Sequence, residues 1–214
     1  MAEQTSLVFK ICERISKYSL LAAIFLVPLF FLPWTSEALD FNKQAVAGLL
    51  LAVSMFSWMI KALVSGKFHL NLSKINIAIG AFFLIYILST LFSVNRQGSF
   101  WGWPQLTADS LISLIIFTAA YFLALNLFSK RDVYVALSVF LVSAFVAQII
   151  GILQILGVYL PFSFAASPSF NTIGTPGALG FFSAIILCIT IAMMVQGNKW
   201  QRIFSALQIF ASAV

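Results

Sequence analysis

Long apolar runs, separated by short polar links, are the feature that most constrains this chain of 214 residues. Apolar residues make up 62% of the sequence and charged residues only 8%, and the mean hydropathy is +1.04. A membrane-spanning helix needs about 20 mostly apolar residues, because each residue rises about 1.5 Å and the hydrocarbon core is about 30 Å thick. The runs have this length. They therefore predict an all-α, multi-pass transmembrane helical bundle rather than a soluble domain.

The runs predict six full spans and the beginning of a seventh within a transmembrane region that covers residues 18–214. Before it, residues 1–17 place apolar side chains on one helical face and charged ones around the other, which predicts a cytoplasmic amphipathic helix on the membrane surface. A cleaved signal peptide is the alternative, but no small-x-small cleavage pattern follows the first run. We place the spans at about residues 19–34, 43–60, 75–93, 109–128, 133–157 and 177–196, with an incomplete one at 203–214.

The last run is too short to cross a bilayer. Residues 203–214 would reach only about 18 Å of a core about 30 Å thick, and the last carbonyls of a half-span would lack partners in hydrocarbon. We therefore expect this sequence to be the N-terminal part of a longer protein.

Basic residues are distributed unevenly over the links, which predicts the orientation. Lys and Arg gather in alternate connections, and this bias marks the cytoplasmic side. Only Lys43 and Arg96 fall on the opposite side. The basic excess therefore reflects topology, not nucleic-acid binding, and predicts a membrane protein whose N-terminus is cytoplasmic. The cytoplasmic set is Lys10, Arg14, Lys17, Lys61, Lys67, Lys74, Lys130, Arg131, Lys199 and Arg202.

The link from Ser89 to Asp109 carries most of the polar candidates on the predicted outer side. Arg96, next to Asn95, could hold a phosphate or diphosphate, because guanidinium makes paired bonds to such oxygens. Alternatively, it snorkels to lipid headgroups or pairs with Asp109. Trp101 and Trp103 suit the interfacial aromatic belt or a sugar-stacking platform. Asp109 is expected to cap the following helix.

Two glutamines lie inside the fifth predicted span. Gln148 and Gln154 share a helical side with Ala144 and Gly151. Amides in hydrocarbon need partners, and small residues let another helix approach, so we expect this stripe to face the bundle. A polar track for a substrate is the alternative.

The sequence contains no metal-ligand spacing, glycine-rich phosphate loop or nucleophile elbow, so no metal or cofactor is predicted. His69 is the single histidine and falls in a predicted cytoplasmic link, where it could not serve an external reaction. Cys12 and Cys188 are interpreted as packing residues.

Three stretches resemble the bacterial O-antigen ligase and O-antigen polymerase superfamily. The first, YILSTLFSVNRQGSFWG, contains an LST-x-FS-x-N element and an SFWG element. The second is the apolar run LISLIIFTAAYFLALNLF. The third, FNTIGTPGALGFFSAI, matches a span-opening family motif at Gly174, Thr175 and Gly177.

The resemblance implies a metal-independent membrane glycosyltransferase that moves or polymerises a glycan from an undecaprenyl-diphosphate carrier at the outer face of the bacterial plasma membrane. It also implies that the catalytic histidine and arginines belong to a C-terminal half outside this sequence. The expected partners are membrane lipids and a polyprenyl-diphosphate-linked glycan, without nucleic acid. Arg96, Lys43, Asn95 and Trp101 are the predicted substrate-binding residues.

Two other classes of function remain open. A transporter or flippase fragment should carry ionisable residues deep within its spans. A structural membrane protein should tolerate replacement of Arg96 and Asn95. The glycan, the acceptor and the oligomeric state are not predicted.

Overall fold

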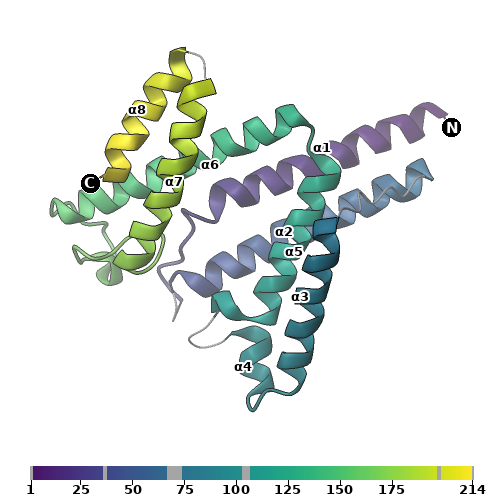
Figure 1. Ribbon diagram of the computed structural model, residues 1–214, viewed down its shortest axis with the longest axis horizontal. Helices are drawn as coiled ribbons and strands as arrows, with labels where there is room; N and C mark the ends of the chain where they lie inside the picture. Colours follow the sequence, from purple (N-terminus) through teal and green to yellow (C-terminus); the bar gives the residue numbers. More distant parts are fainter. Residues whose placement is uncertain (1, 36–37, 67–73, 103–106, 197–198, 214) are drawn as a thin grey trace. The chain divides into compact units, whose positions relative to one another are not determined.

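A computed structural model describes residues 2–35, 38–66, 74–102, 107–196 and 199–213. The predictions for Lys67, His69 and Trp103 lie outside these residues. Every regular element in the described ranges is helical, which confirms the all-α prediction. In chain order the elements are α1 (Ala2–Leu26), α2 (Asp40–Ser65), α3 (Lys74–Leu91), α4 (Arg96–Trp101), the 3-10 turn η1 (Thr107–Asp109), α5 (Leu111–Leu127), α6 (Lys130–Ile155), the 3-10 turn η2 (Ser163–Ala165), α7 (Pro176–Gln196) and α8 (Lys199–Ala213) (Figure 1).

Three described helices are long and apolar enough to cross a membrane: Asp40–Ser65, Lys130–Ile155 and Pro176–Val195. The six full spans that the sequence predicted are therefore not supported. The apolar helices Ile75–Leu91 and Leu111–Leu127 are shorter. Their 17 residues each reach about 26 Å, less than a hydrocarbon core of about 30 Å.

The N-terminal helix is continuous across the boundary at which the sequence analysis divided a surface helix from a first span, and this division stays a prediction. α1 continues from Ala2 through the boundary near residue 18 and ends at Leu26. Pro28 explains the end, because proline lacks an N–H and disfavours helical geometry in the residue before it. The amides of Leu29 and Phe30 both bond back to the Leu26 carbonyl and close the turn.

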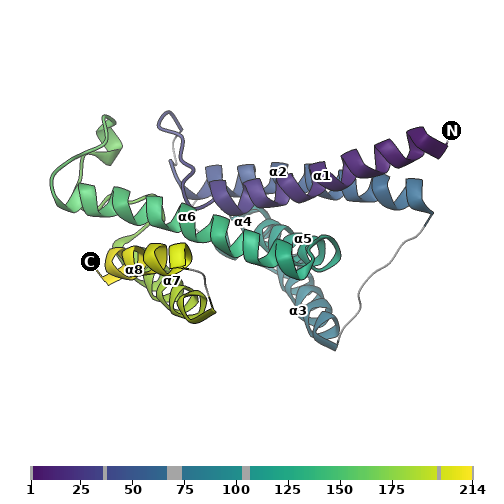
Figure 2. The same ribbon diagram turned by 90° about the horizontal axis from the view of Figure 1, so that it is seen from above.

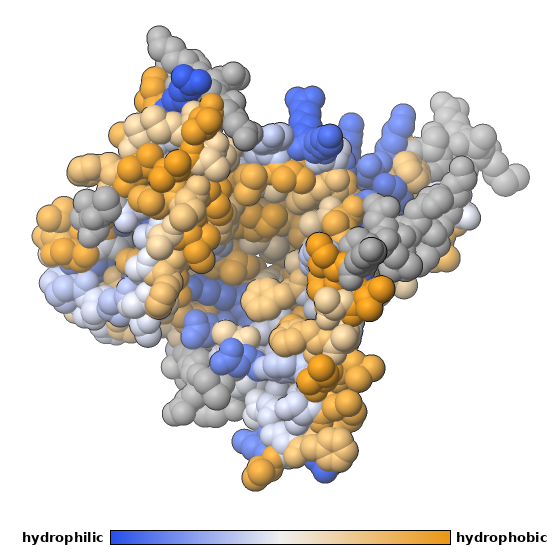
Figure 3. Space-filling view, in the orientation of Figure 1, coloured by the Kyte–Doolittle hydropathy of each residue, from blue (hydrophilic) through white to orange (hydrophobic). Residues whose placement is uncertain are grey.

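Polar side chains point inward and large apolar side chains point outward along several helices. Ser16, Ser54, Thr190 and Gln208 are buried, whereas Leu63 of α2 is 80% exposed. A water-soluble fold usually buries leucine and phenylalanine and exposes serine and glutamine, so this arrangement is the opposite. It suits a hydrocarbon surround, in which small and polar residues mediate helix contacts. The space-filling view shows hydrophobic surface over α3, α7 and α8 (Figure 3).

The chain divides into two compact units, and the first comprises residues 1–23 and 44–133. Within it α1 and α2 lie side by side (Figures 1 and 2). Ser16 and Ser54 each donate a hydroxyl hydrogen bond to the other's carbonyl oxygen, both at 2.8 Å. Leu20, Leu51, Leu123 and Leu127 form the buried apolar core of this unit. The short helix α4 packs against both α3 and α5.

The second unit comprises residues 24–43 and 134–214. α7 and α8 form an antiparallel pair that is apparent in both ribbon views (Figures 1 and 2). Leu141, Ala144 and Ile186 make its buried apolar core. The loop before α7 is held by aromatic contacts, in which the ring of Phe31 meets three other rings at centroid distances of 5.9 to 6.1 Å. These three belong to Phe162, Phe164 and Phe170.

Candidate functional site

Asn95, Arg96 and Trp101 come together on α4 and its cap in the first unit. The side chain of Asn95 caps the helix, since its Oδ1 accepts a hydrogen bond from the Gly98 amide at 3.0 Å. A Cβ at Gly98 would lie 2.6 Å from Asn95 Nδ2. Gly102 ends the helix at φ 75°, a conformation that glycine adopts readily. The pattern N-R-x-G-S-F-W-G therefore specifies a short helix with a cap at each end. The sequence analysis had treated this segment only as a link between two spans.

The turn leaves a cation and an indole on the surface. Arg96 is exposed, and Trp101 is 48% exposed with its ring edge-on to Phe100 at 5.2 Å. Among the described residues no ion pair joins Arg96 to Asp109. The alternative in which these two residues pair is therefore not found. A guanidinium presented in this way can meet a phosphate oxygen of a lipid or of a ligand.

Asp109 does not cap α5, so this prediction was wrong. The helix begins at Leu111, two residues after Asp109, and the cap is Ser110, whose hydroxyl accepts from the Ser113 amide at 3.2 Å. Asp109 instead ends the 3-10 turn η1, and its carbonyl oxygen accepts the hydroxyl of Tyr86. Serine in extended backbone conformation at a helix start is as good a cap as aspartate.

The sequence interpretation missed Gln44. Its Nε2 donates to the hydroxyl oxygens of Ser110 and Ser113, both at 2.9 Å. Both hydroxyls in turn donate to the carbonyl oxygen of Thr107. This polar cluster joins α2 to the start of α5. A glutamine at the edge of an apolar run gives no periodic signal from which to find it.

Lys43, the fourth predicted binding residue, belongs to the second unit. Its ammonium donates to the carbonyl oxygens of Thr172 and Ile173, the latter at 3.1 Å. It therefore holds the loop that precedes α7. The structure thus gives this lysine a loop-anchoring contact, while its predicted contact with a substrate stays a prediction.

The glutamine stripe of α6 faces the interior of the second unit, as predicted. Gln148 is only 3% exposed, and Ala144, Gly151 and Gln154 are buried with it. Gln148 Nε2 donates to Ser183 of α7 and Ser212 of α8, both at 3.0 Å. Its Oε1 accepts from Gln208 Nε2 at 2.7 Å. One amide thus joins α6 to two other helices.

Gln154 holds the loop between α6 and α7 of the same unit. Its amide is oriented so that Nε2 donates to the Ala165 carbonyl at 3.1 Å and Oε1 accepts from the Leu160 amide at 3.2 Å. Asn171 organises the next part of the loop, since its Oδ1 accepts from the amides of Ile173 and Gly174. These contacts fix the backbone of the loop that joins the end of α6 to the start of α7.

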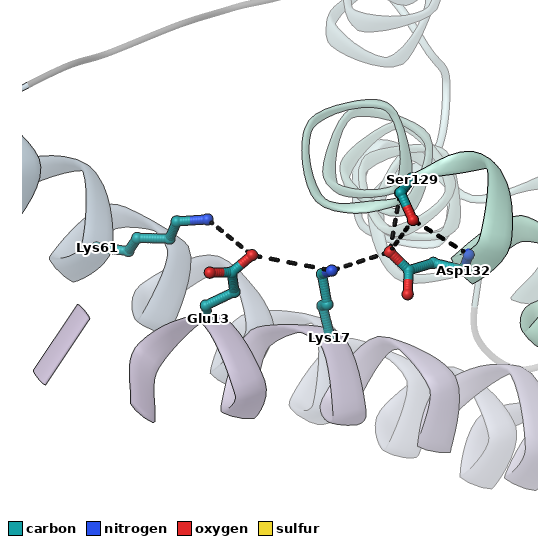
Figure 4. A network of polar contacts seen from close by, with 5 residues as sticks. All are labelled: Glu13, Lys17, Lys61, Ser129 and Asp132. Carbon is teal, nitrogen blue, oxygen red and sulfur yellow. Dashed lines mark hydrogen bonds and ion pairs between the residues drawn. The ribbon is translucent and has the colours of Figure 1, made fainter. Parts of the chain in front are cut away.

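Charged side chains among the described residues of the first unit form a network (Figure 4). Lys17 of α1 lies 2.9 Å from an Asp132 carboxylate oxygen and 3.8 Å from Glu13. Lys61 of α2 lies 3.4 Å from Glu13. Asp132 also accepts from the amide and hydroxyl of Ser129. The network ties α1, α2 and the start of α6 together, and every member has a partner within it.

A cavity of about 310 Å³ lies beside the Gln148 cluster in the second unit. The described residues hold no group of three or more His, Cys, Asp or Glu side chains placed to bind a metal ion. Comparison with known proteins finds no matching family model, no matching curated protein and no matching solved structure.

Proposed function

We propose that this protein binds a polyprenyl-diphosphate-linked glycan at the outer face of a bacterial plasma membrane, as part of an O-antigen ligase-like glycosyltransferase. The single observation that carries the proposal is the segment from Tyr86 to Gly102. It resembles that superfamily in sequence, and it forms a capped turn that leaves Arg96 exposed. The guanidinium of Arg96 would grip the diphosphate, and Asn95 would hold the turn.

The proposal includes a membrane topology. The three long apolar helices are crossings, and α1, α3 and α5 complete a multi-pass bundle in spite of their shorter apolar lengths. Local thinning of the bilayer and interfacial residues accommodate such a mismatch at a modest cost in free energy. In this topology the N-terminus is cytoplasmic, and α4 and the loop before α7 face outward, because most basic residues belong to the other set of links.

Replacing Arg96 tests the proposal. Arg96→Ala should weaken binding of undecaprenyl diphosphate about tenfold or more, because hydrogen bonds to charged groups contribute about 1.5–3 kcal/mol each. Binding is measured by native mass spectrometry of the protein in nanodiscs, with undecaprenol as the uncharged comparison lipid. Binding of undecaprenol should not change.

Arg131→Ala is the matched control, because Arg131 is also an exposed arginine but lies on the predicted cytoplasmic side. It should leave diphosphate binding unchanged. If Arg96→Ala and Arg131→Ala bind undecaprenyl diphosphate equally well, Arg96 does not contact the carrier and the proposal loses its binding residue.

A further inference from the structure

The cavity of the second unit has a wall of mixed chemistry. Its volume of about 310 Å³ is at the lower end of the range for small-molecule sites, about 300–1,000 Å³. Apolar side chains such as Ile152 and Leu179 form part of the wall. Polar groups of Gln148, Ser183 and Ser212 form another part. Such a combination can hold a ligand that has both carbon surface and hydroxyl groups.

The wall carries no formal charge. The described residues that line the cavity include no Asp, Glu, Lys, Arg or His. A phosphate or an ammonium group would lose its hydration there without a counter-charge, at a cost of several kcal/mol. Uncharged hydroxyl groups lose far less and can be matched by amides and serines. The chemistry of the described wall therefore favours uncharged ligands over ionic ones.

The polar part of the wall is held in place and retains hydrogen-bonding capacity. Gln148 positions the oxygens of Ser183 and Ser212 by donating to both. The hydroxyl of Ser212 donates a hydrogen bond to the backbone carbonyl oxygen of Gln208. Ser183 accepts from Gln148, but it gives its hydroxyl hydrogen to no described acceptor. Behind this layer the Oε1 of Gln208 is buried without a partner. A pre-positioned donor on a cavity wall is a recognition element for a hydroxyl oxygen.

The space for a ligand is maintained by a glycine. Gly180 lines the cavity from α7, and a Cβ built on it would meet nothing within 4 Å. Glycine in the middle of a helix costs about 1 kcal/mol relative to alanine. Because the space around its Cβ position is open, Gly180 is a position at which a larger side chain could fill the cavity without straining the backbone. Gly151 is different, because a Cβ there would lie 3.2 Å from Leu179.

We propose that this cavity binds an uncharged polyhydroxyl group. The inference does not depend on Arg96 or on the diphosphate carrier, so either proposal can fail without the other. Two sources offer the same chemistry: a free sugar or polyol, and the headgroup of an uncharged lipid. Both are hydroxyl-rich and carry no charge.

Binding to the full chain in nanodiscs tests the inference. The free probe is methyl α-glucoside, measured by calorimetry, and the lipid probe is monoolein, measured by retention in native mass spectrometry. Glucose 6-phosphate and phosphatidylglycerol are the charged counterparts. At least one neutral probe should bind, and its charged counterpart should bind at least tenfold more weakly. Binding of the glucoside identifies a free polyol as the source, and binding of monoolein alone identifies a lipid headgroup.

Two variants locate the binding in this cavity. Gly180→Leu should reduce neutral-probe binding more than tenfold by filling the space. Ser183→Ala should reduce it about fivefold, the effect of one hydrogen bond of about 1 kcal/mol. Gly80→Leu on α3 is the control, because Gly80 is also a helical glycine with open space around its Cβ position.

The inference is overturned if neither neutral probe binds, if the charged probes bind as tightly, or if Gly180→Leu and Ser183→Ala both bind like the unmodified protein. A thermal unfolding curve of each variant confirms that it is folded. Ser183→Ala keeps the test valid if Gly180→Leu does not fold.

Discussion

At the scale of single residues, Gln148 joins α6 to both α7 and α8. Its amide bonds to Ser183, Ser212 and Gln208. Gln148→Leu would leave these groups buried without their partner, at about 1–3 kcal/mol for an unsatisfied group. We expect a loss of about 2 kcal/mol in unfolding free energy, measured by SDS titration in mixed micelles.

A second substitution separates lost hydrogen bonds from altered packing. Gln148→Leu combined with Gln208→Leu removes both partners of the 2.7 Å bond. Replacing both partners by apolar groups is close to neutral, so the double variant should be less destabilised than the sum of the two single variants. Strict additivity would show that the two amides are not coupled.

Residue roles were predictable from the sequence where periodicity and chemistry agreed. The spacing of Gln148 and Gln154 with two small residues placed them on one buried face, and the structure confirms this. Ser110 and Gln44 were not predictable in this way. A cap depends on where the backbone leaves helical geometry, and a single polar residue at the end of an apolar run does not reveal its partner.

At the scale of elements, the crossing of α1 and α2 depends on a pair of serines. The hydroxyl oxygens of Ser16 and Ser54 lie 3.2 Å apart, and both side chains are fully buried. Ser16→Cys combined with Ser54→Cys should therefore form a disulfide under mild oxidation, in a background with Cys12→Ser and Cys188→Ser. The bond is measured by cleaving the loop between α1 and α2 with a protease and running a non-reducing gel. A disulfide keeps the two fragments together in one band.

Val53 provides the control for this bridge. It precedes Ser54 on α2 but is 41% exposed, so its side chain points away from the crossing. Ser16→Cys with Val53→Cys should not crosslink. Efficient crosslinking of the Val53 pair, or none for the Ser54 pair, would contradict the packing of these two helices.

The charged network predicts a second element-scale effect. Lys17 pairs with Glu13 and Asp132, and these three side chains are about a quarter to a third exposed to solvent. Because solvent screens such pairs, Lys17→Met should cost only about 1 kcal/mol or less of unfolding free energy. Added salt should reduce the difference from the unmodified protein. Lys10→Met, at an exposed position of the same helix, should have no salt-dependent effect.

Helices were predictable, but their lengths relative to the membrane were not. Hydropathy located the apolar runs, and α2, α3, α5, α6, α7 and α8 coincide with them within a few residues. Three rather than six helices are long and apolar enough to cross a membrane. α1 ends at Leu26, inside the first predicted span, and α3 and α5 are shorter than the runs suggested. Caps such as Ser110 and the turn at Asn95 shorten these helices. Such local hydrogen bonds are not visible in hydropathy.

At the scale of the whole molecule, the proposed membrane topology requires apolar side chains to face lipid and polar side chains to face protein. Composition predicted a membrane protein, and the three long apolar helices support that class. The burial of Ser54 and Gln208 beside exposed Leu63 and Phe210 adds an observation that composition could not provide. The direction in which the helices cross rests on the distribution of basic residues alone.

Cysteine labelling on intact cells tests this topology most directly. Gln97→Cys, in a background with Cys12→Ser and Cys188→Ser, introduces a thiol at an exposed position of α4 and leaves Arg96 unchanged. Lys130→Cys, in the same background, introduces a thiol at an exposed position on the predicted cytoplasmic side. A membrane-impermeant maleimide should label position 97 in intact cells and position 130 only after permeabilisation. Labelling of position 97 only after permeabilisation would place α4 inside the cell and contradict the proposed outward-facing carrier site.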